Sequence, residues 1–101
     1  MSINRLRLVI TGASGGIGRA LIRVMQPHID LIILNGLDKQ SLEQVRDELG
    51  LKNCHIIPGD VLDPEVRQNI YTIAETNGGI NLLLNNAGMN DFNSFKINQM
   101  K

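Results

Sequence analysis

The sequence predicts an α/β fold in which a parallel sheet of four strands is covered by helices on both faces. Short apolar runs alternate with segments whose apolar residues recur at helical spacing along the 101 residues. Such alternation is typical of right-handed crossovers between parallel strands. A glycine-rich segment also follows the first apolar run directly, as expected where a strand turns sharply into a helix. The length allows one domain.

The first strand is predicted at residues 6–10, and the first helix begins at about residues 16–18, behind the glycines. Pro27 ends this helix, because proline cannot continue helical backbone hydrogen bonding. The helix is expected to bury one apolar face, formed by Ile17, Leu21, Val24 and Met25.

The second strand is predicted at residues 31–34, and Gly50 is placed to cap the carboxyl end of the helix that follows. The buried face of that second helix is expected to consist of Leu42, Val45 and Leu49. The third strand is predicted at residues 54–57. Pro58 directly after it favours an edge position, where proline is tolerated.

Asp63 and Pro64 have the residue types of an N-cap and a first helical position, so a third helix is predicted to begin there. Its buried stripe is expected at Val66, Ile70 and Ile73, and residues 77–79 end it. The fourth strand is predicted at residues 82–84.

The predicted strand order is 3-2-1-4. In this order the first and fourth strands are neighbours, and a crevice opens at their carboxyl ends, where ligands of such sheets bind. The two unusual segments of the chain, TGASGGIG at residues 11–18 and NNAG at residues 85–88, both fall at this crevice. This coincidence indicates a binding site.

Composition excludes several classes of partner. The ten Lys and Arg residues balance ten Asp and Glu residues, so neither nucleic acid nor an anionic membrane is an expected partner. No segment has the length of a membrane span or a signal-peptide core. A cytoplasmic protein is expected, and the single Cys54 fits a reducing compartment. Cys54, His55 and His28 do not have the spacing of a metal site.

The glycine loop is suited to a pyrophosphate, because the first turn of a helix presents amide groups and the positive end of its dipole. The spacing TGxxxGxG differs from GxGxxG and from a Walker loop. TGASGGIG, Asp60-Val61 and NNAG, in this order, resemble the short-chain dehydrogenase/reductase family, whose fold is Rossmann-like. Gly15 also satisfies TGxxGxxG, the pattern of the family's extended branch, but NNAG favours the shorter branch.

The resemblance implies an NAD or NADP cofactor. Its pyrophosphate would be held by Gly12, Ser14, Gly16, Ile17 and Gly18. Asp60 and Val61 would meet the adenine ring, and the adenosine and nicotinamide side would be lined by Asn86, Ala87 and Gly88. The alternative is that each cluster is only a turn, because glycine and asparagine are common in loops.

The sequence leaves the choice between NAD and NADP open. The family usually carries its discriminating acid or arginine at the positions of Gly36 and Leu37, and neither residue can act as one. Asp38 is either a reader of the NAD ribose or a helix N-cap, and Lys39 either meets a phosphate or is solvated.

The resemblance covers residues 6–88 and does not reach the family's catalytic serine or its YxxxK motif. Tyr71 is followed four residues later by Glu75, so no catalytic residue is assigned. Residues 1–88 are predicted to form a cofactor-binding half-domain, truncated before the fifth strand, with an irregular polar tail at residues 89–101. Two interpretations remain: part of an oxidoreductase that is inactive alone, or a non-catalytic nucleotide-binding module or inert remnant.

The fourth strand is expected to present an unpaired edge, which favours self-association. The alternative is that the tail covers this edge through Phe92 and Phe95.

Overall fold

The structure is a computed structural model and describes residues 5–86. Its four strands, β1 (Leu6–Thr11), β2 (Ile29–Gly36), β3 (Cys54–Pro58) and β4 (Leu82–Asn85), form one parallel sheet in the order β3-β2-β1-β4. The order predicted from the sequence is confirmed. The described sheet therefore places β3, with Pro58, and β4 at its two edges.

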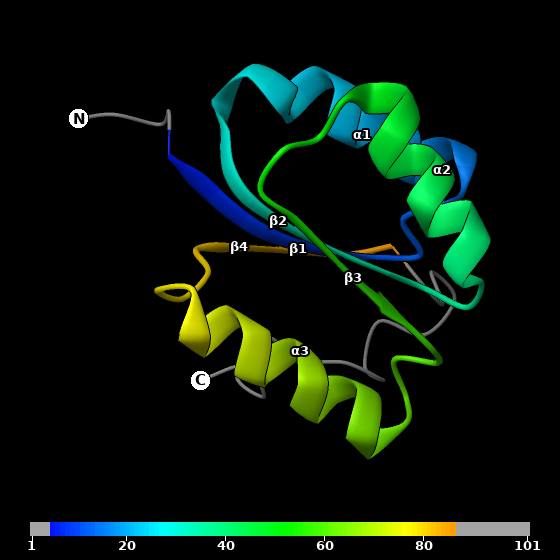
Figure 1. The fold of residues 1–101 in the computed structure, drawn as a ribbon, viewed down its shortest axis with the longest axis vertical. Coiled ribbons are helices and arrows are strands. Elements are labelled where there is room, and N and C mark those ends of the chain that lie inside the picture. The colour runs from blue at the N-terminus through cyan, green and yellow to red at the C-terminus, as the bar shows by residue number, and fades with distance from the viewer. Residues whose placement is uncertain (1–4, 87–101) are drawn as a thin grey trace.

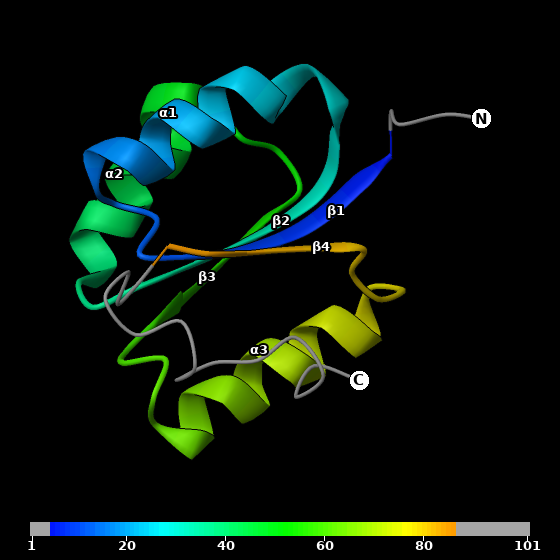
Figure 2. The same cartoon turned by 180° about the vertical axis from the view of Figure 1, so that it is seen from behind.

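Helices cover both faces of this sheet. Helix α1 (Gly16–Met25) and helix α2 (Lys39–Leu49) lie on one face, and helix α3 (Pro64–Thr76) lies on the other (Figures 1 and 2). This division follows from right-handed crossovers: the chain moves from β1 to β2 to β3 in one direction, then reverses to reach β4. The reversal places the carboxyl ends of β1 and β4 side by side, with Ile10 opposite Leu84.

The predicted helix ends are confirmed. The side chain of Asp38 caps α2 by accepting a hydrogen bond from the Ser41 amide, and Asp63 caps α3 by accepting one from the Glu65 amide. Gly50 ends α2 with a φ of 63°, a left-handed conformation that favours glycine. A short 3-10 helix containing Pro27 separates α1 from β2.

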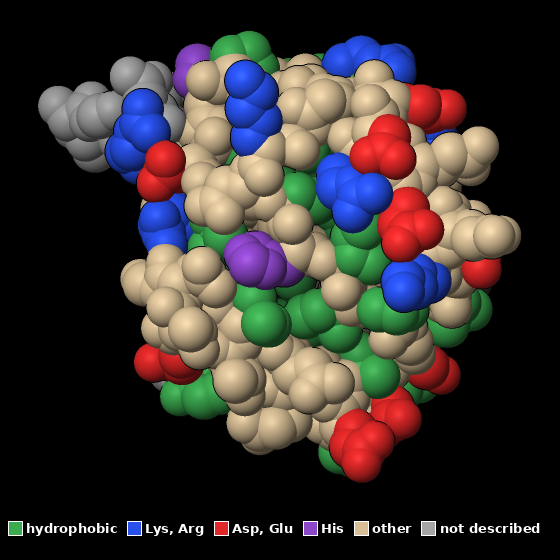
Figure 3. Space-filling view, in the orientation of Figure 1, with side chains coloured by type: hydrophobic (Ala, Val, Ile, Leu, Met, Phe, Trp, Pro, Cys, Tyr) green, Lys and Arg blue, Asp and Glu red, His purple; other side chains and the backbone are tan. Residues whose placement is uncertain are grey.

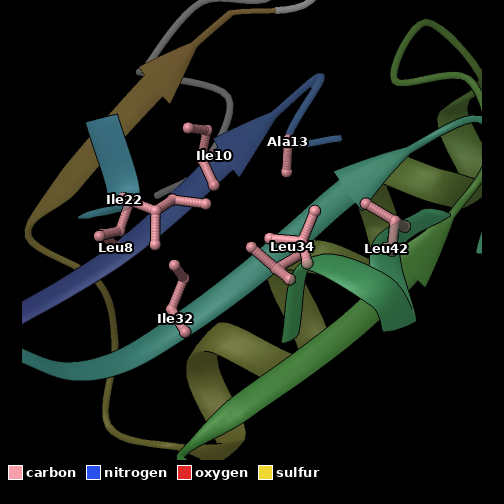
Figure 4. Close-up of a cluster of buried hydrophobic side chains, with 8 residues drawn as sticks. Leu8, Ile10, Ala13, Ile22, Ile32, Leu34 and Leu42 are labelled. Atoms are coloured by element: carbon pink, nitrogen blue, oxygen red, sulfur yellow. The ribbon is translucent and has the colours of Figure 1, made fainter. Parts of the chain in front are cut away.

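Alternation of side chains along the strands produces two core clusters. Val9 and Ile33 point to the α3 side, where they pack with Ile57, Val61, Val66, Ile70 and Ala74. The opposite side holds Leu8, Ile10, Ala13, Ile22, Ile32, Leu34, Leu42 and Val45 under α1 and α2 (Figure 4). A strand buried on both faces needs consecutive apolar residues, and the runs in β1 and β2 supply them.

The predicted apolar face of α1 is wrong for three of its four residues, whereas the fourth, Met25, packs partly buried against the core. Ile17, Leu21 and Val24 are 55%, 38% and 77% exposed, and the buried residues of this helix are Gly18 and Ile22. The reason is the close approach of Gly18 to the preceding loop. A Cβ at Gly18 would lie 2.8 Å from the Ala13 carbonyl oxygen, so this face turns inward, and Ile22 follows it one helical turn later.

Basic and acidic residues are equal in number in the sequence, at ten each. Figure 3 shows acidic and basic side chains interspersed on the face that it draws. Among the helices of residues 5–86, none is long and apolar enough to cross a membrane.

Candidate functional site

The loops after all four strands surround one pocket of about 530 Å³ at the carboxyl edge of the sheet. The loop after β1 contributes Gly12, Ser14 and Gly15, and the β2 end contributes residues 35–38. Residues 59–61 follow β3, and Asn86 follows β4. A larger cavity of about 620 Å³ lies at the amino ends of β2 and β3 and has no glycine loop. The carboxyl edge therefore remains the candidate site.

Hydrogen bonds join the loops after β1, β2 and β3. The Ala13 amide donates to the Asn35 carbonyl at 2.9 Å, and the Gly59 amide donates to the Gly36 carbonyl at 2.8 Å. The side-chain amide of Asn35 donates to the carbonyl oxygens of Ile57 and Gly59, at 2.9 and 3.0 Å. These bonds fix the pocket wall on the β3 side.

Asn35 is a site residue that the sequence reasoning did not single out. It is 1% exposed, yet its side chain is polar. Such a residue needs hydrogen-bond partners, because burying an unpaired amide is costly. A polar residue at the end of an apolar strand was the available signal.

On the other side of the pocket, the last residue of β4 and the residue after it bind the end of β1 and the glycine loop. The Asn86 side-chain amide donates to the Gly12 carbonyl at 3.0 Å, and the Thr11 hydroxyl donates to Oδ1 of Asn85 at 3.0 Å. The structure thus brings together the two segments that the sequence placed at one crevice. Ala87 and Gly88 lie outside the described residues.

The glycines of the loop have different functions in the structure. Gly12 has a φ of 62°, so it makes the turn after β1. Gly18 packs closely against the loop itself. Gly16 begins α1, is exposed, and has no atom within 4 Å of the position that a Cβ would take. The space at Gly16 is therefore open to a ligand, and no capping side chain covers the start of α1.

Not all of the predicted site residues line the pocket. Gly12, Ser14, Asp60, Val61 and Asn86 line the pocket, whereas the start of α1 lies beyond its lining. Val61 is only 5% exposed and packs in the α3-side core. Its contact with a ligand is therefore limited to a small part of its surface. Oδ1 of Asp60 accepts a hydrogen bond from the Leu62 amide at 2.9 Å, which orients the carboxylate.

Other reactive groups lie away from the pocket. Tyr71 is partly buried on α3 and does not line it. Among residues 5–86, no group of three or more His, Cys, Asp or Glu side chains is placed to hold a metal ion.

The Cys54 thiol is expected to react slowly in the folded protein, because burial raises its pKa from 9.0 to about 11. At pH 8 we expect iodoacetamide to alkylate the native chain about 100-fold more slowly than the urea-unfolded chain, in proportion to the thiolate present. Between pH 9 and 11 the unfolded state loses this proton first, so the free energy of unfolding should fall as pH rises. Equal alkylation rates in both states would contradict the shift in pKa.

A family model described as short chain dehydrogenase matches residues 7–101. The chain belongs to the short-chain dehydrogenase family. Relatives of this chain include the oxidoreductase UcpA of Salmonella typhimurium, 40% identical over 85 residues, which are 80% of this chain and 32% of that protein. An uncharacterized oxidoreductase of Staphylococcus aureus is 32% identical over 81 residues, which are 79% of this chain and 35% of the relative.

Solved structures similar to this chain are also short-chain dehydrogenases. A short-chain dehydrogenase/reductase from Brucella melitensis is 33% identical with a TM-score of 0.70, over 79% of this chain and 34% of that chain. One from Mycobacterium smegmatis is 27% identical with a TM-score of 0.69, over 85% of this chain and 38% of that chain. The chain thus spans about a third of the length of the two curated oxidoreductases. The family implies a nicotinamide dinucleotide cofactor and oxidoreductase chemistry.

Proposed function

We propose that this chain is the cofactor-binding part of a short-chain dehydrogenase and binds a nicotinamide dinucleotide at the carboxyl edge of its sheet. The observation that carries the proposal is the joining of the glycine loop to both neighbouring strand ends, through Asn35 and Asn86. The pocket is thereby fixed in shape. The site also fits the cofactor, because the open backbone at Gly16 leaves space for a phosphate that a side chain would fill.

Each part of the proposed site, which joins the pocket to the start of α1, has a proposed role. Gly12, Ser14 and residues 16–18 hold the pyrophosphate at the start of α1, where backbone amides and the helix dipole favour an anion. Asp60 accepts a hydrogen bond from the adenine amine, and Val61 offers a small apolar contact. Asn86 is proposed to line the adenosine and nicotinamide side, and the same role is proposed for Ala87 and Gly88, which lie outside the described residues. A bound nicotinamide would supply or accept a hydride.

Turnover is not part of this proposal for the 101-residue chain. Its one tyrosine, Tyr71, is followed by Glu75 where a YxxxK motif would have lysine. A tyrosine that acts as a base at neutral pH depends on a neighbouring cation, and the residue four positions after Tyr71 is acidic instead. This feature also favours the second candidate, a non-catalytic nucleotide-binding module. A YxxxK motif in the reading frame after codon 101 would favour the oxidoreductase.

The cytoplasmic location remains a prediction.

Calorimetry with NAD, NADP and AMP tests the proposal. We expect binding of at least one dinucleotide with a Kd of about 10 µM to 1 mM, because the contacts proposed for the described residues reach the adenosine and pyrophosphate groups and little else. No change in nicotinamide absorbance is expected over a panel of alcohols and carbonyl compounds. Absence of heat with every nucleotide would contradict the proposed binding, and turnover would contradict the assigned lack of a proton donor.

We also propose that the chain associates with itself through β4, an edge strand of the described sheet. All four residues of β4 are only half-buried, and three of them are leucines. Analytical ultracentrifugation at micromolar concentration should show oligomers, and Leu83→Lys should shift them towards monomer.

The variant Val24→Lys is the matched control, because Val24 is an exposed apolar residue on α1, away from β4. It should leave the oligomers unchanged. A monomer in the unmodified chain, or dissociation by Val24→Lys alone, would contradict the assignment to β4. Circular dichroism must show that each variant remains folded.

A further inference from the structure

A second cavity lies at the amino edge of the sheet, at the opposite end of the strands from the proposed cofactor pocket. Its volume of about 620 Å³ is in the usual range of ligand pockets. Its walls are the segment from the end of α1 to the start of β2 and the segment from the end of α2 to the start of β3. Figure 1 shows both segments at the end of the sheet where β2 begins. No described residue lines both cavities, so a function of this amino-edge cavity would be separate from dinucleotide binding.

The floor of the amino-edge cavity is apolar. Ile32, in β2, is 1% exposed and belongs to the core under α1 and α2. Ile29 and Leu51 line the cavity beside it, and both are partly buried against the same core. Apolar surface in a cavity favours contact with an apolar group over contact with water. The floor therefore suits the apolar part of a ligand.

The backbone carbonyl groups at the end of α2, which borders the cavity, are already engaged. The Arg46 carbonyl accepts a hydrogen bond from the Leu51 amide at 3.0 Å. The Leu49 carbonyl accepts one from the side-chain amide of Gln26. These donors satisfy groups that would otherwise form the negative end of the helix. The end of α2 consequently repels an anion less than an uncapped helix end would.

The charged side chains leave an excess of positive charge at the cavity. Its described lining contains three of them, Arg23, Asp30 and Lys52. The Asp30 carboxylate is compensated, because it pairs with Arg5 at 2.8 Å and with Arg7 at 3.0 Å. Arg23 and Lys52 are exposed, and neither has an acidic partner within residues 5–86. The cavity thus combines two uncompensated cations with an apolar floor.

We propose that the amino-edge cavity binds a small monocarboxylate that carries an apolar chain. The carboxylate would be held by Arg23 and Lys52, because guanidinium and ammonium groups form charge-assisted hydrogen bonds with it. The chain would lie against Ile29, Ile32 and Leu51, where it is removed from water. Cations alone would bind any anion weakly, and the floor alone would not distinguish an acid from an alcohol. The combination predicts that binding depends on both the charge and the chain.

Calorimetric titration of the 101-residue chain with sodium octanoate tests this inference. We expect a Kd of about 0.1 to 5 mM, as is usual for a ligand of so few atoms. Octanol has the chain without the charge, and acetate has the charge without the chain. Each should bind at least about tenfold more weakly than octanoate. Added salt should weaken octanoate and leave octanol unchanged, because Arg23 and Lys52 are exposed.

Variants of the two cations locate the site. Arg23→Gln and Lys52→Gln remove one charge each, and together they should weaken octanoate about tenfold without affecting octanol. The matched control for Lys52→Gln is Lys39→Gln, because Lys39 is likewise exposed but does not line the cavity. This control should leave octanoate binding unchanged. So should Leu83→Lys, which alters the half-buried strand β4 instead. Circular dichroism must show that each variant remains folded.

Each alternative gives a different result. Equal binding of octanoate and octanol would contradict recognition of the carboxylate, and equal effects of Lys39→Gln and Lys52→Gln would contradict its position. Weakening by Leu83→Lys would place the chain at β4. Absence of heat with octanoate would contradict the inference and leave the proposed dinucleotide binding untouched. If only a chain without residues 2–4 bound octanoate, the amino-terminal segment would be the occupant of the cavity instead.

Discussion

Replacing Gly16 with valine should remove dinucleotide binding and leave the fold intact. The valine side chain would occupy the open space at the start of α1, where the proposed pyrophosphate meets backbone amides. Loss of two or more charge-assisted hydrogen bonds corresponds to about a 100-fold weaker affinity. Because nothing lies within 4 Å of this Cβ position, the free energy of unfolding should change by less than about 1 kcal/mol. Calorimetry and urea unfolding measure the two quantities.

Two further variants serve as controls for Gly16→Val. Gln44→Val places the same side chain at an exposed position of α2, away from the pocket, and should affect neither quantity. Gly18→Val should destabilise the chain, because its Cβ would lie 2.8 and 2.9 Å from the carbonyl oxygens of Ala13 and Gly12. An unchanged affinity in Gly16→Val would show that the cofactor does not approach this turn.

Replacing Asn35 with leucine should lower the free energy of unfolding by about 2–5 kcal/mol, because two carbonyl groups lose their hydrogen bonds while a side chain of similar size remains buried. These are the carbonyl groups of Ile57, at 2.9 Å, and Gly59, at 3.0 Å. Release of the loop after β3 should also weaken nucleotide binding, since Asp60 follows Gly59 directly. Urea unfolding at low protein concentration and calorimetry measure the two effects.

Asn53→Leu is the matched control for this variant. The Asn53 side chain likewise donates one hydrogen bond to a backbone carbonyl, that of Asp30 at 2.9 Å, but at an exposed position. Water can replace that bond, so the loss in stability should stay below about 1 kcal/mol. If Asn35→Leu costs no more than Asn53→Leu, the buried amide does not hold the pocket wall together.

The sequence by itself determined the elements, their order and the edge of the sheet at which the candidate pocket lies. Proline and aspartate at the start of α3 and glycine after α2 restrict the backbone locally, so their effects can be recognised without a structure. The strand order follows from the alternation of elements and from the handedness of crossovers. That order brings the glycine loop and Asn86 to one edge of the sheet.

Only the tertiary structure decided which side chains are buried and which hold the pocket together. The Ile17, Leu21 and Val24 stripe has helical spacing, yet the contact of Gly18 with the loop turns a different face of α1 inward. Val61 was predicted to meet a ligand, but it packs mainly in the core. Asn35 donates hydrogen bonds to Ile57 in β3 and to Gly59 in the loop after it, 22 and 24 residues away in the chain. Spacing along a chain reports which residues share a face, whereas burial and long-range hydrogen bonds depend on the elements that pack against that face.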